Sequence, residues 1–142
     1  MKNPRTEPPL TSIPSSQQAA RQNSLLLILW GGVILFSSTD VAGAWANACY
    51  QWLLGSPAEF SSETLHWVAQ KSFHVALFAV FGWLLARRSP SQPSLLAGVM
   101  WSFAMGAVSE GVQFLFATRN PASTDFVLNG LTGSFFFWLR VR

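Results

Sequence analysis

Four long apolar stretches divide the chain, and polar or proline-containing connections separate them. A helix that crosses the hydrocarbon core of a membrane needs roughly 20 predominantly apolar residues. The stretches that approach this length predict transmembrane helices at about 24–39, 65–86, 94–117 and 125–141. The pattern therefore predicts an all-α, polytopic membrane protein, in which residues 24–142 form a bundle of four transmembrane helices.

The segments outside these stretches have a different character. Residues 1–23 are polar, hold four prolines and contain no repeat, which predicts a disordered cytoplasmic tail. The connection at about 40–64 is the longest, and its stretch 50–54 suits a short helix in the membrane interface. The two remaining connections, 89–93 and 118–124, contain proline and suit turns between antiparallel spans.

The composition excludes several classes of protein. Only 11% of the residues are charged, against about 25% in soluble domains, so a soluble domain is excluded. The single cysteine, Cys49, excludes an intramolecular disulfide and a cysteine-based zinc site. The net charge of +3 does not indicate a nucleic-acid partner, because the basic residues lie at segment ends instead of forming one patch.

Basic residues predict the orientation of the spans. With the N-terminus in the cytoplasm, seven of the nine lysines and arginines are cytoplasmic: Lys2, Arg5, Arg21, Arg87, Arg88, Arg140 and Arg142. An excess of lysine and arginine marks the cytoplasmic side of membrane proteins. The sequence thus predicts a multi-pass membrane protein with both termini in the cytoplasm. Most tryptophans fit the expected interfacial belts, but Trp30 and Trp101 do not.

A cleaved signal peptide is an alternative interpretation of the first span. Basic residues precede this apolar run, and 42–44 or 46–48 supplies the small residues of a cleavage site. Cleavage would leave three spans.

Polar and ionisable residues recur at helical spacing inside the predicted spans. They form the pairs Lys71 and His74, Glu110 and Gln113, and Asp125 and Asn129. At 1.5 Å per residue, all of them lie within roughly 14 Å of the outer ends of their spans. Arg119 lies in the outer connection between the last two spans. These residues therefore form one layer near the outer ends of the spans. A charge at the centre of a bilayer costs on the order of 3 kcal/mol, so this layer predicts that the side chains face a cavity or pair with one another.

The helical faces point to the same conclusion. Small residues continue the polar positions at intervals of four, as in Gly98, Ser102, Gly106 and Glu110. The same interval links Asp125 to Asn129 and Gly133, and His74 to Phe78 and Gly82. Small residues allow membrane helices to approach closely, so we expect these stripes and their polar residues to face the interior of the bundle.

The order of the polar residues resembles the VanZ-like family of small membrane proteins. Its pattern is K-x-x-H, then E-x-x-Q, an arginine six residues on, an aspartate six further and an asparagine four after that. The matching residues, between about 65 and 137, are Lys71, His74, Glu110, Gln113, Arg119, Asp125 and Asn129. The sequence departs from the family at Gln70, Phe78 and Thr132, where an acid, a tyrosine and a glycine are common. The resemblance implies a cell-envelope protein of the bacterial plasma (inner) membrane, with a link to resistance against the glycopeptide teicoplanin.

Several functions fit this set of residues. The first is a non-enzymatic site, open to the outer leaflet, for the headgroup of a lipid or a lipid-linked cell-wall precursor, with Lys71 and Arg119 supplying positive charge. The second is an enzyme acting on a lipid-linked substrate, although no catalytic triad is evident. The third is a structural or assembly role, in which Lys71 pairs with Glu110 and Arg119 with Asp125. A transporter would need an internal repeat, which this short chain does not show. We expect no metal, because the histidine-rich spacing of metal sites is missing, and we expect no cofactor.

Overall fold

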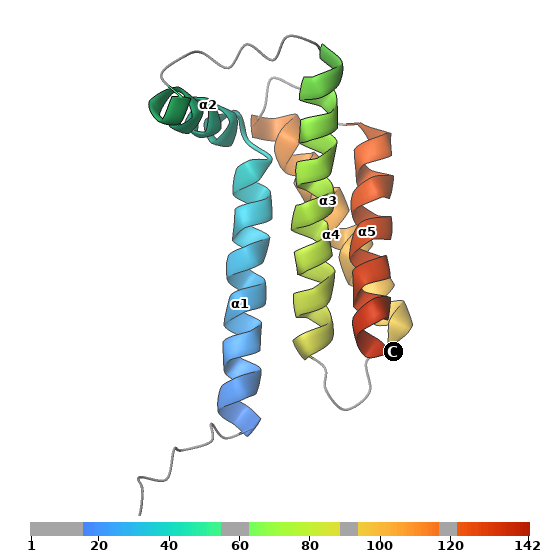
Figure 1. Ribbon diagram of the computed structural model, residues 1–142. Coiled ribbons are helices and arrows are strands. Elements are labelled where there is room, and N and C mark those ends of the chain that lie inside the picture. Colours follow the sequence, from blue (N-terminus) through green and yellow to red (C-terminus); the bar gives the residue numbers. More distant parts are fainter. Residues whose placement is uncertain (1–15, 55–62, 89–93, 117–121) are drawn as a thin grey trace, which may run out of the picture.

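The computed structural model describes residues 16–54, 63–88, 94–116 and 122–142, and within them the chain forms helices and no strands (Figure 1). The helices are α1 (Ser16–Ser37), α2 (Asp40–Leu54), α3 (Glu63–Arg88), α4 (Leu95–Phe116) and α5 (Ser123–Val141). The prediction of an all-α fold is therefore confirmed.

Two helices in the described residues are long and apolar enough to cross a membrane. They are Gln18–Ser37, within α1, and Leu95–Phe116, which is α4. The described parts of α3 and α5 do not meet the same criterion. In α5, Asp125 and Asn129 interrupt the apolar residues. On length and hydropathy, the described residues thus support two membrane-crossing helices and not the predicted four.

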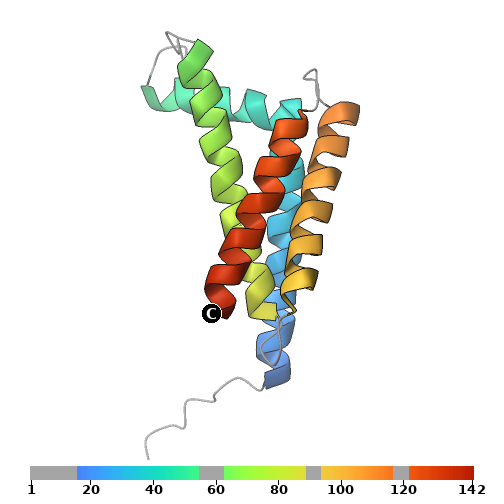
Figure 2. The same ribbon diagram turned by 90° about the vertical axis from the view of Figure 1, so that its right-hand side faces the viewer.

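The long helices α1, α3, α4 and α5 lie side by side, and α2 lies across one end of them (Figures 1 and 2). Helix α5 packs most extensively, against both α3 and α4, whereas α1 packs mainly against α3. The apolar core includes Phe78, Phe81 and Leu85 of α3 with Phe137 of α5 and Ile34 of α1. We refer below to the end where α2 lies as the α2 end.

Two predicted boundaries need correction. Helix α1 begins at Ser16, so the part of the predicted disordered tail from residue 16 onward is helical, and residues 1–15 lie outside the described residues. The connection after α1 contains the 15-residue helix α2, which is far longer than the short helix expected at 50–54. A break separates α1 and α2, where the hydroxyls of Ser37 and Ser38 donate to the carbonyl of Ile34 at 2.7 and 2.9 Å. Hydroxyls that bond back to helix carbonyls in this way favour a bend.

Glycines set the close approach of α5 to its neighbours. A Cβ atom at Gly82 of α3 would overlap the backbone carbonyl of Gly133 in α5. A Cβ atom at Gly98 of α4 would overlap the ring of Phe137. Both glycines are buried, as are Ser102 and Gly106 on the same face of α4. The expectation that the small-residue stripes face the interior is confirmed.

Side-chain hydrogen bonds attach α1 to the other helices. The indole nitrogen of Trp30 donates to the backbone carbonyl of Leu77 in α3 at 2.8 Å. Near the α2 end, the hydroxyls of Ser38 and Ser109 lie 2.8 Å apart and join α1 to α4. Trp30 fits no interfacial belt because its indole bonds a neighbouring helix.

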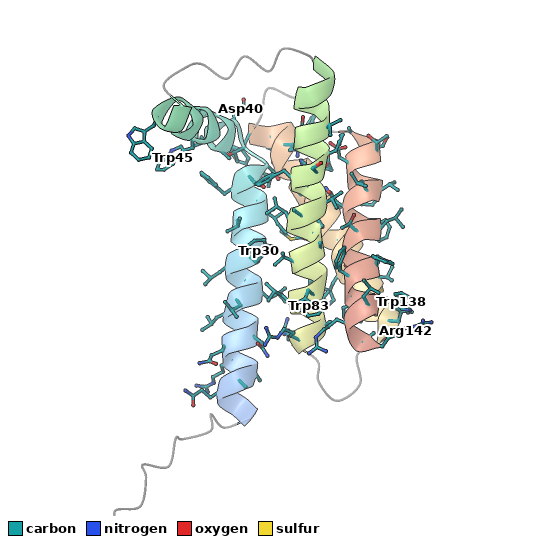
Figure 3. All side chains as sticks on the ribbon, viewed as in Figure 1. Trp30, Asp40, Trp45, Trp83, Trp138 and Arg142 are labelled. Atoms are coloured by element: carbon teal, nitrogen blue, oxygen red, sulfur yellow. The ribbon has the colours of Figure 1, made fainter. Side chains whose placement is uncertain are left out.

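The end of the bundle opposite the α2 end is basic. Arg87 and Arg88 lie in the last turn of α3, and Arg140 in the last turn of α5. Arg140 lies over the ring of Trp83 with 5.2 Å to its centroid, and Arg142 lies over Trp138 at 4.1 Å (Figure 3). Cation–π contacts of this kind hold arginine side chains against apolar helix surfaces. We call this end the basic end.

Candidate functional site

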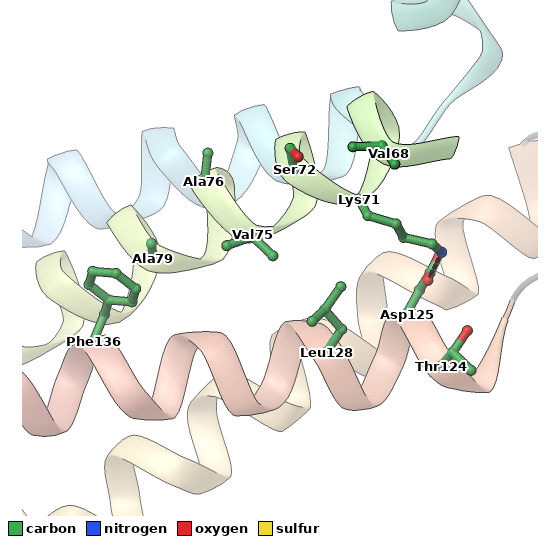
Figure 4. A pocket seen from close by; sticks show the side chains of 10 residues that line it. All are labelled: Val68, Lys71, Ser72, Val75, Ala76, Ala79, Thr124, Asp125, Leu128 and Phe136. Carbon is green, nitrogen blue, oxygen red and sulfur yellow. Dashed lines mark hydrogen bonds and ion pairs between the residues drawn. The ribbon is translucent and has the colours of Figure 1, made fainter. Parts of the chain in front are cut away.

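An ion pair between α3 and α5 is the centre of the polar site. The amine of Lys71 bonds a carboxylate oxygen of Asp125, as Figure 4 shows. The side chain of Lys71 is 18% exposed and that of Asp125 is 5% exposed, so the pair is shielded from its surroundings. The structural role considered from the sequence paired Lys71 with Glu110. This pairing is wrong, because α5 packs between α3 and α4 and its Asp125 forms the ion pair with Lys71.

Glu110 has a different partner. Its Oε2 atom accepts a hydrogen bond of 3.1 Å from the backbone nitrogen of Ala122, which immediately precedes α5. The bond fixes the start of α5 against α4. The second oxygen, Oε1, is buried and has no hydrogen-bond partner in the described part of the chain.

Asn129 is the most deeply buried polar residue of the site. It is 0% exposed, and neither Nδ2 nor Oδ1 has a hydrogen-bond partner among the described residues. It lies where α5 crosses α4, because a Cβ atom at Gly106 would be 3.6 Å from the Cβ of Asn129. An unmet buried polar group costs roughly 1–3 kcal/mol, so Asn129 is unfavourable for the stability of the helix packing at this position.

The remaining predicted residues are distributed as follows. His74 of α3 and Gln113 of α4 are buried, as their helical faces predicted. Arg119 lies outside the described residues, so its predicted pairing with Asp125 does too. Six of the seven predicted site residues therefore lie in the halves of α3, α4 and α5 nearest the α2 end, and all except Lys71 are buried.

The ion pair lies at one end of a groove between α3 and α5. The groove has a volume of about 730 Å³, and its polar lining is Lys71, Ser72, Thr124 and Asp125. The rest of its wall is apolar, from Val68 along α3 to Ala79, and along α5 to Phe136 (Figure 4). From Val68 to Ala79 the helix rises by roughly 16 Å at 1.5 Å per residue. The site thus consists of an ion pair at one end of a long groove whose remaining wall is mostly apolar.

Sequence reasoning missed the walls of this groove. Ser72 follows Lys71 and Thr124 precedes Asp125, so their positions beside the charged residues were available signals. Val75 and Ala79 lie four and eight residues after Lys71 and extend its helical face. The matching wall on α5 could not be identified in advance, because the pairing of α3 with α5 was not known.

The comparisons with known proteins add no further evidence. No family model, curated protein or solved structure matches the chain. Within the described residues, His, Cys, Asp and Glu side chains form no group of three that could hold a metal ion.

Proposed function

We propose that the chain is a VanZ-like protein of the bacterial plasma membrane that binds a lipid headgroup at its Lys71–Asp125 site. In this proposal α1, α3, α4 and α5 all cross the membrane, both termini are cytoplasmic, and the α2 end faces outward. The observation that supports this proposal is the groove between α3 and α5, which has the ion pair at one end and mostly apolar walls along the rest of its length.

The groove has the chemistry of a site for an amphiphile. The Lys71 ammonium is a donor for a phosphate, and the Asp125 carboxylate accepts from an amine or hydroxyl of the same headgroup. Its length of roughly 16 Å is close to half of the ~30 Å hydrocarbon core, the depth of one leaflet. An acyl or polyprenyl chain that follows Val75 and Ala79 would place its headgroup at the ion pair.

The position of α2 supports the proposed orientation. Its Trp45 and Trp52 side chains are 67% and 84% exposed, on a helix that lies across the bundle end. Tryptophan is enriched at the boundary between membrane and water, and amphipathic helices lie in that plane. The headgroup site would then open toward the outer leaflet. The VanZ-like resemblance extends the proposal to a lipid-linked cell-wall precursor as ligand and to glycopeptide resistance as the setting.

Native mass spectrometry of the purified protein tests the proposal. We expect the wild type to retain a lipid in this groove, and Lys71→Ala to retain one lipid molecule fewer than the wild type while its helix content by circular dichroism is unchanged. Ala76→Phe keeps the ion pair but narrows the groove, so it should lose the lipid as well. Arg87→Ala, which removes an exposed charge at the basic end, is the matched control. Retention of as many lipid molecules by Lys71→Ala and Ala76→Phe as by the wild type would refute the proposal.

A structural role is the second candidate, and the ion pair itself favours it. Lys71 and Asp125 connect α3 to α5, and hydrogen-bonded polar groups hold membrane helices together. This role predicts that replacing either Lys71 or Asp125 alone makes the protein unfold more readily, whether or not a lipid is bound.

A further inference from the structure

A crevice that shares no lining residue with the groove between α3 and α5 lies among α1, α3 and α4 and extends to Phe137 of α5. It consists of two adjoining cavities of about 280 and 340 Å³, which share Leu85, Arg88 and Trp101 in their walls. Ile28 and Gly31 of α1 line the smaller cavity, together with Ala104 and Val108 of α4. The crevice is therefore separate from the groove that holds the Lys71–Asp125 pair.

The crevice has the depth of one leaflet. Its lining on α4 runs from Ala97 to Val108, a rise of roughly 16 Å at 1.5 Å per residue. This is close to half of the ~30 Å hydrocarbon core. The polar residues of its wall, Arg88 and Ser94, lie together at the basic end. The crevice thus resembles the α3–α5 groove in form, but it points toward the opposite leaflet.

Charge at this end favours an anion. Arg88 is the ionisable residue that lines both cavities, and its side chain is exposed. Arg87 and Arg140 lie at the same end, while the acidic residues that the structure describes belong to the α2 end: Asp40, Glu63, Glu110 and Asp125. These carboxylates are therefore remote from Arg88 along the bundle axis. A guanidinium next to an apolar crevice suits a phosphate that carries a hydrocarbon chain.

We propose that this crevice binds one anionic glycerophospholipid of the leaflet at the basic end. Its phosphate bonds Arg88, and one acyl chain lies against Trp101 between α1 and α4. A helix from a partner protein does not fit, because a helix is about 10 Å across with its side chains, which is too wide for cavities of this size. The site also explains why Trp101 follows no interfacial belt: its ring forms part of the wall.

Competition between two lipids tests this proposal. The full-length protein is exchanged into detergent with equal amounts of phosphatidylglycerol and phosphatidylcholine, and native mass spectrometry measures the lipids retained. We expect the wild type to retain phosphatidylglycerol preferentially. Arg88→Gln should lower this preference about five-fold, since a single basic residue contributes about 1 kcal/mol toward an anionic lipid. Arg87→Gln changes an exposed neighbour that does not line the crevice, and it should retain the preference.

Two further variants test whether the crevice itself holds the lipid. Ala104→Phe leaves Arg88 in place but fills the crevice, so it should lose the phosphatidylglycerol. Ala76→Phe narrows the α3–α5 groove without touching the ion pair or the crevice and should still retain one phosphatidylglycerol, which distinguishes failure of this site from failure of the proposed function. Equal losses in Arg87→Gln and Arg88→Gln would indicate general attraction to a basic surface and would overturn the proposal. Full retention by Ala104→Phe, or no preference in the wild type, would overturn it too.

Discussion

At the scale of single residues, Lys71 and Asp125 show how a charge is accommodated between apolar helices. The carboxylate is almost fully buried and the ammonium is shielded, and the two lie on different helices. Removing one member of a buried ion pair leaves an uncompensated charge, whereas replacing both by apolar residues is often tolerated. The pair therefore specifies how α3 docks on α5 more than it adds net stability.

Lys71→Met and Asp125→Leu should each lower the free energy of unfolding by about 3 kcal/mol, because each leaves a buried charge. The double variant should lose much less than the sum of these effects. Unfolding in detergent with increasing dodecyl sulfate, followed by circular dichroism, measures these changes. A stable double variant that retains one lipid molecule fewer than the wild type would support the binding site, whereas one that retains as many would leave the pair with a structural role only. Simple additivity would contradict the coupling of the two charges.

The hydrogen bond from Trp30 leads to a second prediction. Trp30→Phe keeps an aromatic ring against α3 but removes the donor to the carbonyl of Leu77. We expect a loss of about 1 kcal/mol in the free energy of unfolding, in the range measured for hydrogen bonds between membrane helices. Trp101→Phe, which alters an exposed tryptophan on α4, provides the comparison in the same unfolding measurement. Equal effects of the two substitutions would show that the indole hydrogen bond does not stabilise the fold.

The sequence predicted which polar residues are buried better than it predicted the groups that they bond. Helical spacing correctly predicted that His74, Glu110, Gln113, Asp125 and Asn129 would be buried. It could not predict that Glu110 accepts from the Ala122 backbone, or that Trp30 donates to the Leu77 carbonyl. Backbone partners leave no signal in side-chain patterns, and a partner on another helix depends on how the helices pack. The binding role of the site residues stays a prediction.

At the scale of helices, glycines decide how closely α5 approaches α3 and α4. The intervals of four that link Gly82 to His74 and Gly133 to Asn129 predicted these contact faces from the sequence alone. Helix α2 was harder to predict, because a 15-residue helix across the bundle end has neither the length of a span nor a strong turn signal. The early start of α1 was missed for a related reason: its first turns are polar, and polar helical residues resemble a tail in composition.

Gly82→Ala should destabilise the contact of α3 with α5. The added methyl group would overlap the Gly133 carbonyl, and backbone atoms cannot move aside as a flexible side chain can. We expect a loss of about 2 kcal/mol, typical of overpacking, in the same unfolding measurement. Gly111→Ala is the matched control, since no atom lies within 4 Å of a Cβ there. A Gly82→Ala variant as stable as Gly111→Ala would show that the two helices do not approach each other this closely in the membrane.

At the scale of the whole molecule, charge is separated along the bundle axis. The described arginines lie toward the basic end. The described acidic residues lie in α2 or in the halves of α3, α4 and α5 nearest to it, where Lys71 is the described basic residue. Membrane proteins retain lysine and arginine on the cytoplasmic side. In the arrangement that we propose, the same separation would place the Lys71–Asp125 groove and the Arg88 crevice in opposite leaflets. A single measurement of orientation therefore tests the leaflets that we assign to both sites.

Cysteine accessibility in intact cells provides that measurement. In a Cys49→Ser background, cysteine is introduced at Ala44, exposed in α2, or at Ser94, exposed at the basic end. A membrane-impermeant maleimide should label Ala44→Cys directly, but Ser94→Cys only after the cells are permeabilised, because the arginine-rich end stays in the cytoplasm. The opposite labelling would exchange the leaflets of the two sites. Labelling of both positions in intact cells would mean that α3, which lies between them in the sequence, does not cross the membrane, and this would exclude the four-span arrangement.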